Sequence, residues 1–196
     1  MIRPEHRRAS LRRAMRRHVS QPIPLDGVEA DRLSSSWRAA WGELPPMGPT
    51  LRQSGRGSWQ RRYIRQDRGR GHGNDVEYGE AAGNTSRLLL QFADRHEGSM
   101  AVATSWAEGE VPAWIGLGLP RARHWFQREH DGNTVDFWVA PLSEVTRINP
   151  LVDLVLADLA EVTFASADFA YLAHPYDGGV DFGTCQESTR IVGEER

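Results

Sequence analysis

Residues 169–182, near the C-terminus, constrain the fold of this chain more than any other stretch. Aromatic and aliphatic residues at both ends of the stretch flank the run Pro175-Tyr176-Asp177-Gly178-Gly179. Pro fixes φ, the Asp side chain bonds back to the backbone, and Gly accepts positive φ, so this run predicts a tight turn. We therefore expect a β-hairpin, which needs neighbouring strands to cover it.

The rest of the chain alternates between strand and helix patterns. Further strands are expected at 58–64, 100–106, 114–117, 124–130, 134–140 and 162–164, with Asp131-Gly132-Asn133 turning a second hairpin. Helices are expected from Asp26 or Asp31 to Trp41, from Asp75 to about Phe92, and from Asn149-Pro150 onward. Adjacent strands mixed with helices predict an α+β fold: a single domain with a largely antiparallel sheet packed by two or three helices, and an Arg-rich N-terminal tail.

Length and composition set the domain organisation and the expected compartment. The chain of 196 residues is long enough for one well-packed domain. We expect a flexible basic tail and linker at 1–24, an α+β domain at 25–184 and a polar tail at 185–196. The single Cys185 excludes an internal disulfide framework and a multi-cysteine metal site. With no apolar run near the roughly 20 residues of a membrane span and no secretory signal pattern, the prediction is a cytoplasmic protein without a membrane span.

Positive charge is concentrated in two segments. All 24 basic residues are arginine; seven of them lie from Arg3 to Arg17, and seven more from Arg52 to Arg70. The first segment is also typical of an organelle transit peptide. Both could pair with the acidic remainder of the chain, or bind nucleic acid, anionic lipid or an acidic partner. Arg62 and its neighbour Tyr63 are the candidate contact residues of the second segment.

The C-terminal hairpin holds the densest group of reactive side chains, namely His174, Tyr176, Asp177 and Asp181. A purely structural turn explains most of this pattern. A ligand or partner surface, or a catalytic or metal site, would also use an imidazole beside carboxylates. His124 and His130 are expected to share a strand face, at a separation of about 20 Å that is too long for one metal ion.

Five sets of residues form recognisable motifs. They are Trp37-Arg38-Ala39-Ala40-Trp41-Gly42-Glu43-Leu44-Pro45-Pro46-Met47-Gly48, residues 59–63, Phe137-Trp138-Val139, Asn149-Pro150-Leu151 and His174-Pro175-Tyr176-Asp177-Gly178-Gly179-Val180-Asp181. Over roughly residues 35–182, the chain with these motifs resembles an uncharacterised family common in GC-rich actinobacteria, whose members have a His-Pro-Tyr-Asp-Gly-Gly hairpin near the C-terminus. The resemblance implies a soluble cytoplasmic α+β protein, and it carries over no catalytic residue.

The function predicted first is a non-catalytic protein-recognition module, with another protein as its partner. Immunity proteins that block secreted toxins are an analogy for this role. One alternative is a small metal-binding or hydrolytic enzyme that uses His174, Asp177 and Asp181. Another is nucleic-acid binding through the two arginine segments, which would weaken steeply with salt. No cofactor and no metal site is predicted.

Overall fold

The computed structural model describes residues 23–63, 75–106, 113–119, 121–144, 148–176 and 179–185. The arginine-rich segment up to Arg17, the Gly/Arg stretch at 64–74 and Asp177 lie outside these residues, as does all of the C-terminal tail beyond Cys185. The predictions made for those segments are therefore not addressed by the structure.

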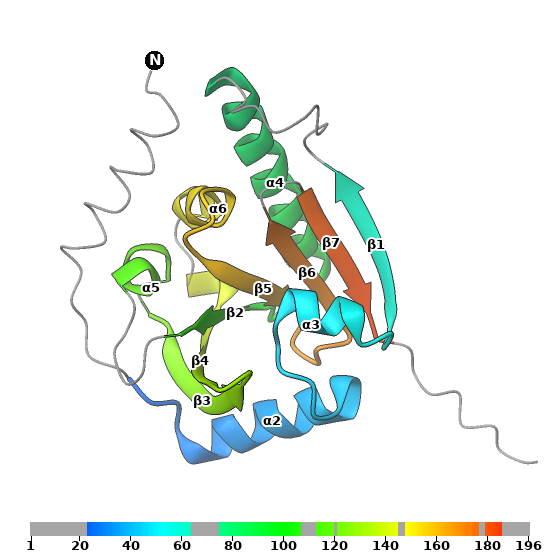
Figure 1. Ribbon diagram of the computed structural model, residues 1–196, viewed down its shortest axis with the longest axis vertical. Helices are drawn as coiled ribbons and strands as arrows, with labels where there is room; N and C mark the ends of the chain where they lie inside the picture. The colour runs from blue at the N-terminus through cyan, green and yellow to red at the C-terminus, as the bar shows by residue number, and fades with distance from the viewer. Residues whose placement is uncertain are drawn as a thin grey trace, which may run out of the picture.

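A seven-stranded antiparallel sheet forms the centre of the protein (Figure 1). Its order is β1-β7-β6-β5-β2-β4-β3, so β1 and β3 are the edge strands. The predicted C-terminal hairpin is confirmed as β6 and β7, and the second hairpin as β3 and β4. The strands are β1 Ser58–Tyr63, β2 Met100–Ser105, β3 Arg123–His130, β4 Asn133–Pro141, β5 Glu161–Ala165, β6 Tyr171–Tyr176 and β7 Gly179–Thr184.

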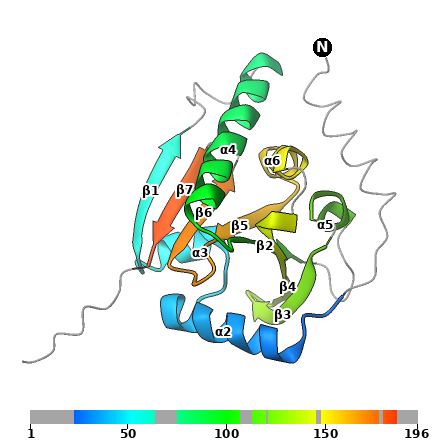
Figure 2. The same cartoon turned by 180° about the vertical axis from the view of Figure 1, so that it is seen from behind.

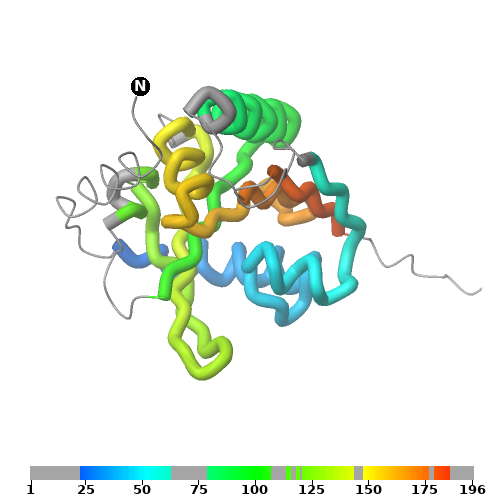
Figure 3. The backbone as a smooth tube through the Cα atoms, turned by 45° about the horizontal axis from the view of Figure 1, so that its top comes forward, coloured from blue at the N-terminus to red at the C-terminus, as the bar shows by residue number. Residues whose placement is uncertain are grey.

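Helices cover both faces of the sheet. Figure 3 shows α4 and α6 on one side of the sheet and α2 and α3 on the other, and Figure 2 shows the same arrangement from behind. The predicted α+β fold is therefore confirmed. The helices are α2 Gly27–Trp41, α3 Gly48–Gln53, α4 Asp75–Arg95, α5 Ala113–Gly118 and α6 Ile148–Leu156.

The three longer helices follow the sequence pattern. Asp26 caps α2 by accepting a hydrogen bond from the backbone N–H of Glu29. Leu33, Trp37 and Trp41 form the buried stripe of α2. The third predicted helix is α6, which begins at Ile148, one residue before the expected cap.

Two short helices differ from the prediction. The residues 114–117 were expected to form a strand, but they lie in α5, where Trp114 and Ile115 are buried against the α6 side of the sheet. A short apolar run does not by itself distinguish a strand from a buried helix, so this prediction was wrong. Likewise α3 starts inside the proline-rich stretch that was expected to be only a turn.

A β-bulge in β3 corrects the expectation for His124 and His130. The register shifts between His124 and Phe126, so both Trp125 and Phe126 pack on the α2 side. His124 then lies opposite Trp138, on the α5 side. His130 follows Phe126 by four residues in the strand and so lies on the same α2 side as Phe126. The two histidines are therefore on different faces of the sheet.

Each face of the sheet buries its own apolar cluster. The cluster beneath α4, α5 and α6 includes Leu89, Trp138, Leu151 and Phe164. The cluster beneath α2 is aromatic, with Trp37, Trp41, Trp125, Phe137 and Phe169 among its members. Leu51 of α3 also belongs to this cluster, and polar side chains lie beside it on the strands that α3 covers.

Candidate functional site

Four polar side chains form a row across four neighbouring strands on the face that α3 covers. Arg61 of β1 lies opposite Asp181 of β7, which lies opposite His174 of β6. Thr163 of β5 continues the row, with its Oγ1 at 3.2 Å from His174 Nδ1 in a hydrogen bond. We call Arg61, Asp181, His174 and Thr163 the polar row. Strand register alone fixes it, since directly opposite residues in antiparallel strands share a face.

Asp181 is buried between two arginines that reach it from different elements. Arg52 Nη1 of α3 lies 2.6 Å from Asp181 Oδ2, and Arg61 Nε lies 3.0 Å from Oδ1. The carboxylate side chain is 2% exposed, against 29% for Arg52 and 44% for Arg61. Both guanidinium groups also lie over the Tyr176 ring, at 5.9 and 5.8 Å from its centroid. One carboxylate thus joins α3 to the sheet and faces two positive charges.

His174 is enclosed by α3 rather than presented to solvent. The side chain lies in a residue that is 5% exposed, and a Cβ at position 48 would overlap the imidazole, so only glycine lets the α3 backbone approach this closely. Burial lowers the pKa of His174 to about 4, assisted by the charge of Arg52 and opposed by Asp181 and by the backbone of Val162. The imidazole is therefore neutral at pH 7.

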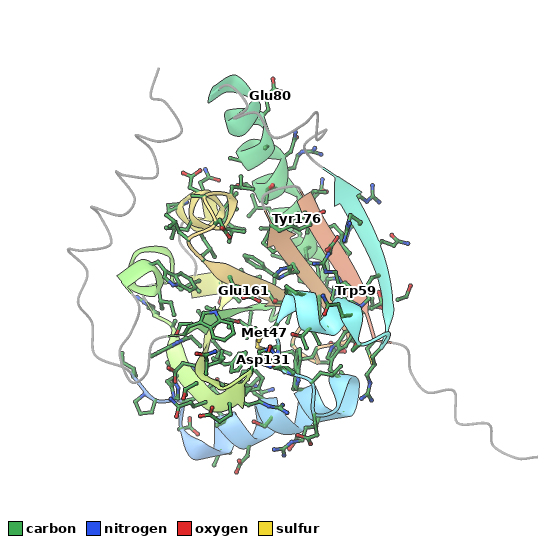
Figure 4. All side chains as sticks on the ribbon, viewed as in Figure 1. Met47, Trp59, Glu80, Asp131, Glu161 and Tyr176 are labelled. Atoms are coloured by element: carbon green, nitrogen blue, oxygen red, sulfur yellow. The ribbon has the colours of Figure 1, made fainter. Side chains whose placement is uncertain are left out.

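Glu161 and Thr104 extend the polar surface beyond the row, toward β2. Glu161 precedes Thr163 by two residues, so both side chains point to the α3 side, and Thr104 lies opposite Glu161. Burial raises the pKa of the Glu161 carboxyl, against a hydrogen bond donated by the Gly48 backbone. In Figure 4, Glu161 and Met47 are labelled beside the start of α3, and Trp59 lies toward its other end.

The structure brings together three of the predicted hairpin residues. His174 and Asp181 face each other across β6 and β7, and Tyr176 lies under the arginines that bind Asp181. His174 and Asp181 are buried beneath α3, so these two side chains do not form an exposed surface for a partner. Asp177 lies outside the described residues.

The two candidates of the arginine segment lie on the edge strand. Arg62 is exposed, and it is opposite Val180 of β7, which places it on the α4 side of the sheet, away from Arg61. Tyr63 is the last residue of β1, and the structure does not describe its side chain. Arg62 and the polar row therefore lie on opposite faces.

Sequence reasoning named Arg52 only as part of an arginine segment, and it did not identify Gly48 or Glu161 as site residues. The first two lie in α3, which was not expected, and Glu161 lies one residue before the predicted strand. Arg61 could have been found, because the alternation of residues 58–64 already separates it from Arg62. No pattern in the sequence indicates that β1 would lie beside β7.

A second polar cluster lies on the opposite face of the sheet. His124 Nε2 is 2.9 Å from Asp136 Oδ1, which also accepts a hydrogen bond from Gln127 Nε2 at 3.3 Å. Ser105 lies opposite Asp136 on β2, so the carboxylate stands between the hydroxyl and the imidazole. A hydrolytic triad requires the imidazole in the middle, and these residues do not have that order.

Neither a metal centre nor a membrane-spanning helix is found in the described part of the chain. No group of three or more His, Cys, Asp or Glu side chains there is arranged to hold a metal ion. None of its helices has the length and apolarity to cross a membrane. The groups that carry chemistry in this site are thus the arginines, carboxyls and hydroxyls beneath and beside α3.

Comparison with known proteins adds no name to this arrangement. No family model, no curated protein and no solved structure matches the chain. The resemblance to the actinobacterial family therefore stays a prediction, and the geometry of the site is the basis of the function proposed below.

Proposed function

We propose that this protein is a non-catalytic recognition protein that binds an acidic, extended segment of a partner protein along the free edge of β1. The observation that carries the proposal is the position of β1. Among the residues that the structure describes, it is an outermost strand of the sheet and pairs with β7 on one side only. An edge strand offers backbone N–H and C=O groups with which an extended peptide can pair.

The charge of this edge favours an acidic partner. Arg61 is half-exposed on the α3 side of β1, and Arg62 is exposed on the α4 side. Arg62 has no ion-pair partner among the residues that the structure describes. Asp and Glu side chains of a bound strand would meet guanidinium groups on both faces.

A protein partner is favoured over a nucleic acid by the state of Trp59, the β1 aromatic residue whose side chain the structure describes. Proteins that bind single-stranded nucleic acid stack bases on available aromatic side chains. The Trp59 ring packs against Trp41, at 5.8 Å between centroids, and lies close over Gly183. This ring is thus engaged within the protein. An immunity-type role is the specific form of our proposal in which the partner is a toxin.

The test is a pull-down from a lysate of the source cells, run with and without nuclease treatment, with three versions of the full chain. Arg62→Glu reverses one charge at the edge, while Arg32→Glu makes the same change at an exposed position on α2. The proposal expects a protein that is bound by the wild type and by Arg32→Glu and is lost with Arg62→Glu. A photo-reactive residue at the exposed Gln60 should cross-link that same protein.

Two results would overturn the proposal. One is recovery of nucleic acid alone, released by salt and removed by nuclease, which would assign the arginines to phosphate binding. The other is a protein partner that Arg62→Glu and Arg32→Glu retain equally, with no cross-link at Gln60. That result would place the interface away from β1.

A further inference from the structure

The contact between α3 and the sheet contains buried polar atoms without hydrogen-bond partners. Within the described residues they include Arg52 Nε on α3, Glu161 Oε1 on β5 and Thr104 Oγ1 on β2. An unsatisfied buried polar group costs about 1–3 kcal/mol. Native structures normally satisfy such groups with protein, water or a ligand. Several of them in one contact therefore indicate a binding site.

The three atoms belong to one place in the fold. Thr104 and Glu161 are directly opposite in the pairing of β2 with β5. Glu161 accepts a hydrogen bond from the Gly48 backbone, and Arg52 follows Gly48 by four residues, so both lie on the sheet-facing side of α3. Thr104 itself is 3% exposed. Thr104 and Glu161 are thus neighbours on the sheet, and Arg52 lies on the side of α3 whose Gly48 backbone contacts Glu161.

The charges around this place determine what could bind there. Arg52 and Arg61 would repel a cation, and Asp181 and Glu161 would repel an anion. An uncharged ligand avoids both repulsions. Arg52 Nε–H can only donate, an ionised Glu161 can only accept, and Thr104 can do both. A hydroxyl group both donates and accepts, and it can therefore satisfy all three.

We propose that an uncharged, hydroxyl-rich small molecule binds between α3 and the sheet, with Glu161, Thr104 and Arg52 as its polar contacts. This site is separate from the β1 edge. It uses side chains that the partner-binding proposal does not involve, apart from Arg52, whose Nη1 holds Asp181.

Entry of the ligand requires α3 to move away from the sheet, since the three atoms are closed to solvent. The contacts that must open include the Arg52–Asp181 ion pair and the packing of Leu51, which is fully buried.

The experiment is a titration of the full-length protein followed through its backbone amide NMR signals. The probes are glycerol, D-ribose, D-glucose and myo-inositol, each added separately, with sodium acetate and methylammonium chloride as charged counterparts. The proposal expects at least one polyol to shift the amides of Thr104, Glu161 and α3 in a saturable way. Amide hydrogen exchange in α3 should slow when that polyol is bound.

Matched variants make the titration specific. Thr104→Val and Glu161→Gln should each raise the dissociation constant of that polyol about tenfold, the equivalent of one hydrogen bond. Thr85→Val is the control, because Thr85 Oγ1 is also buried and unpartnered but belongs to α4. Both this control and Arg62→Glu should leave the dissociation constant unchanged, which separates this site from the β1 edge.

Three outcomes would overturn the inference. The first is that none of the four polyols shifts these amides. The second is that Thr104→Val and Glu161→Gln bind the polyol as tightly as the wild type does. The third is that acetate or methylammonium saturates the same amides at lower concentration than every polyol, which would contradict the argument from charge.

Discussion

The face of the sheet beneath α2 and α3 has two halves that are built in opposite ways. Under α2, aromatic rings contact one another, with 6.1 Å between the centroids of Trp37 and Trp41 and 5.7 Å between those of Trp125 and Phe169. The three indole N–H groups there all donate to oxygen atoms: Leu44 O, Phe169 O and Ser34 Oγ. Under α3, the same sheet carries charges, a neutral imidazole and unpartnered atoms.

The aromatic half is strong enough to hold a strained residue. Phe169 has φ of 60° and is fully buried. A bulky side chain in the left-handed region costs roughly 1–2 kcal/mol, and the rings of Trp37 and Trp125 hold it there. In the polar half, the groups that lower folding stability are buried polar atoms without hydrogen-bond partners among the described residues. The α2 half thus contributes packing, whereas the α3 half contains the unsatisfied groups behind our binding proposal.

Removing the Trp41 side chain should lower the free energy of unfolding more than any other change proposed here, because Trp41 belongs to the tightly packed α2 half. The side chain is fully buried, and its Nε1–H donates to Phe169 O at 2.8 Å. We expect Trp41→Ala to lower the free energy of unfolding by about 3–5 kcal/mol, as measured by urea denaturation. Val28→Ala, an exposed position on the same helix, should change it by less than about 0.5 kcal/mol. A Trp41→Ala loss below 1 kcal/mol would contradict this role of the α2 half.

The two halves differ also in how well the sequence predicts them. The helical spacing of Leu33, Trp37 and Trp41 identifies α2 and its buried side, because the apolar stripe of a helix packs against the core. The alternation in residues 58–64 and the Gly-rich turns likewise give β1 and both hairpins. These elements depend on neighbours in sequence, which pattern reasoning reads directly.

The polar half depends on contacts between distant segments. Its central ion pairs join Arg52 and Arg61 to Asp181, which is 120 or more positions away along the chain. Nothing local indicates that β1 pairs with β7, or that a six-residue helix after two prolines lies on His174. The hairpin residues could thus be named as candidates, but their burial and partners could not.

Asp181→Asn tests whether the ion pairs hold α3 on the sheet. Removing the charge leaves two arginines without their shared partner, while the amide keeps the size of the side chain. Loss of one partner from a buried pair costs about 3–5 kcal/mol, and the half-exposed arginines reduce that to about 2–3 kcal/mol, measured by urea denaturation. Glu43→Gln breaks the exposed pair with Arg38 and should have almost no effect. Equal losses for the two variants would show that Asp181 is not the anchor.

Acid should weaken the α3 half through His174. The folded protein has a His174 pKa of about 4, below the ordinary value of 6.5. Between these pH values the unfolded chain binds a proton that the folded chain does not, so stability is complete above pH 6.5 and falls as the pH decreases toward 4. For His174 alone we expect a loss of about 2 kcal/mol between pH 7 and pH 5.

Comparing wild type with His174→Gln at both pH values isolates this contribution. Glutamine cannot be protonated in this range, and it can still form a hydrogen bond with Thr163, so the variant should lose about 2 kcal/mol less than the wild type on acidification. His130→Gln, at the end of β3, is the control and should follow the wild type. Parallel pH curves for wild type and His174→Gln would mean that the imidazole is solvated and that α3 does not enclose it.

Glu161→Gln is expected to change the free energy of unfolding least, and it tests directly whether the α3 half differs from the α2 half. The raised pKa of Glu161 means that its stabilising contribution is full below about 4.5 and is lost as the pH rises through the folded-state value. Glutamine avoids that loss and can still accept the hydrogen bond from Gly48. We therefore expect the variant to be more stable than wild type at pH 7, by up to about 1 kcal/mol, with the difference disappearing near pH 4.

Urea denaturation at pH 4 and pH 7 measures the difference, and Glu97→Gln, at an exposed position after α4, should show none. A Glu161→Gln variant that is less stable at pH 7 would mean that the carboxylate forms a stabilising bond, and the α3 half would then resemble the α2 half. A gain in stability together with weaker polyol binding would be hard to obtain from a structural residue. That combination is expected of a side chain that lowers the stability of the fold but contributes to ligand binding.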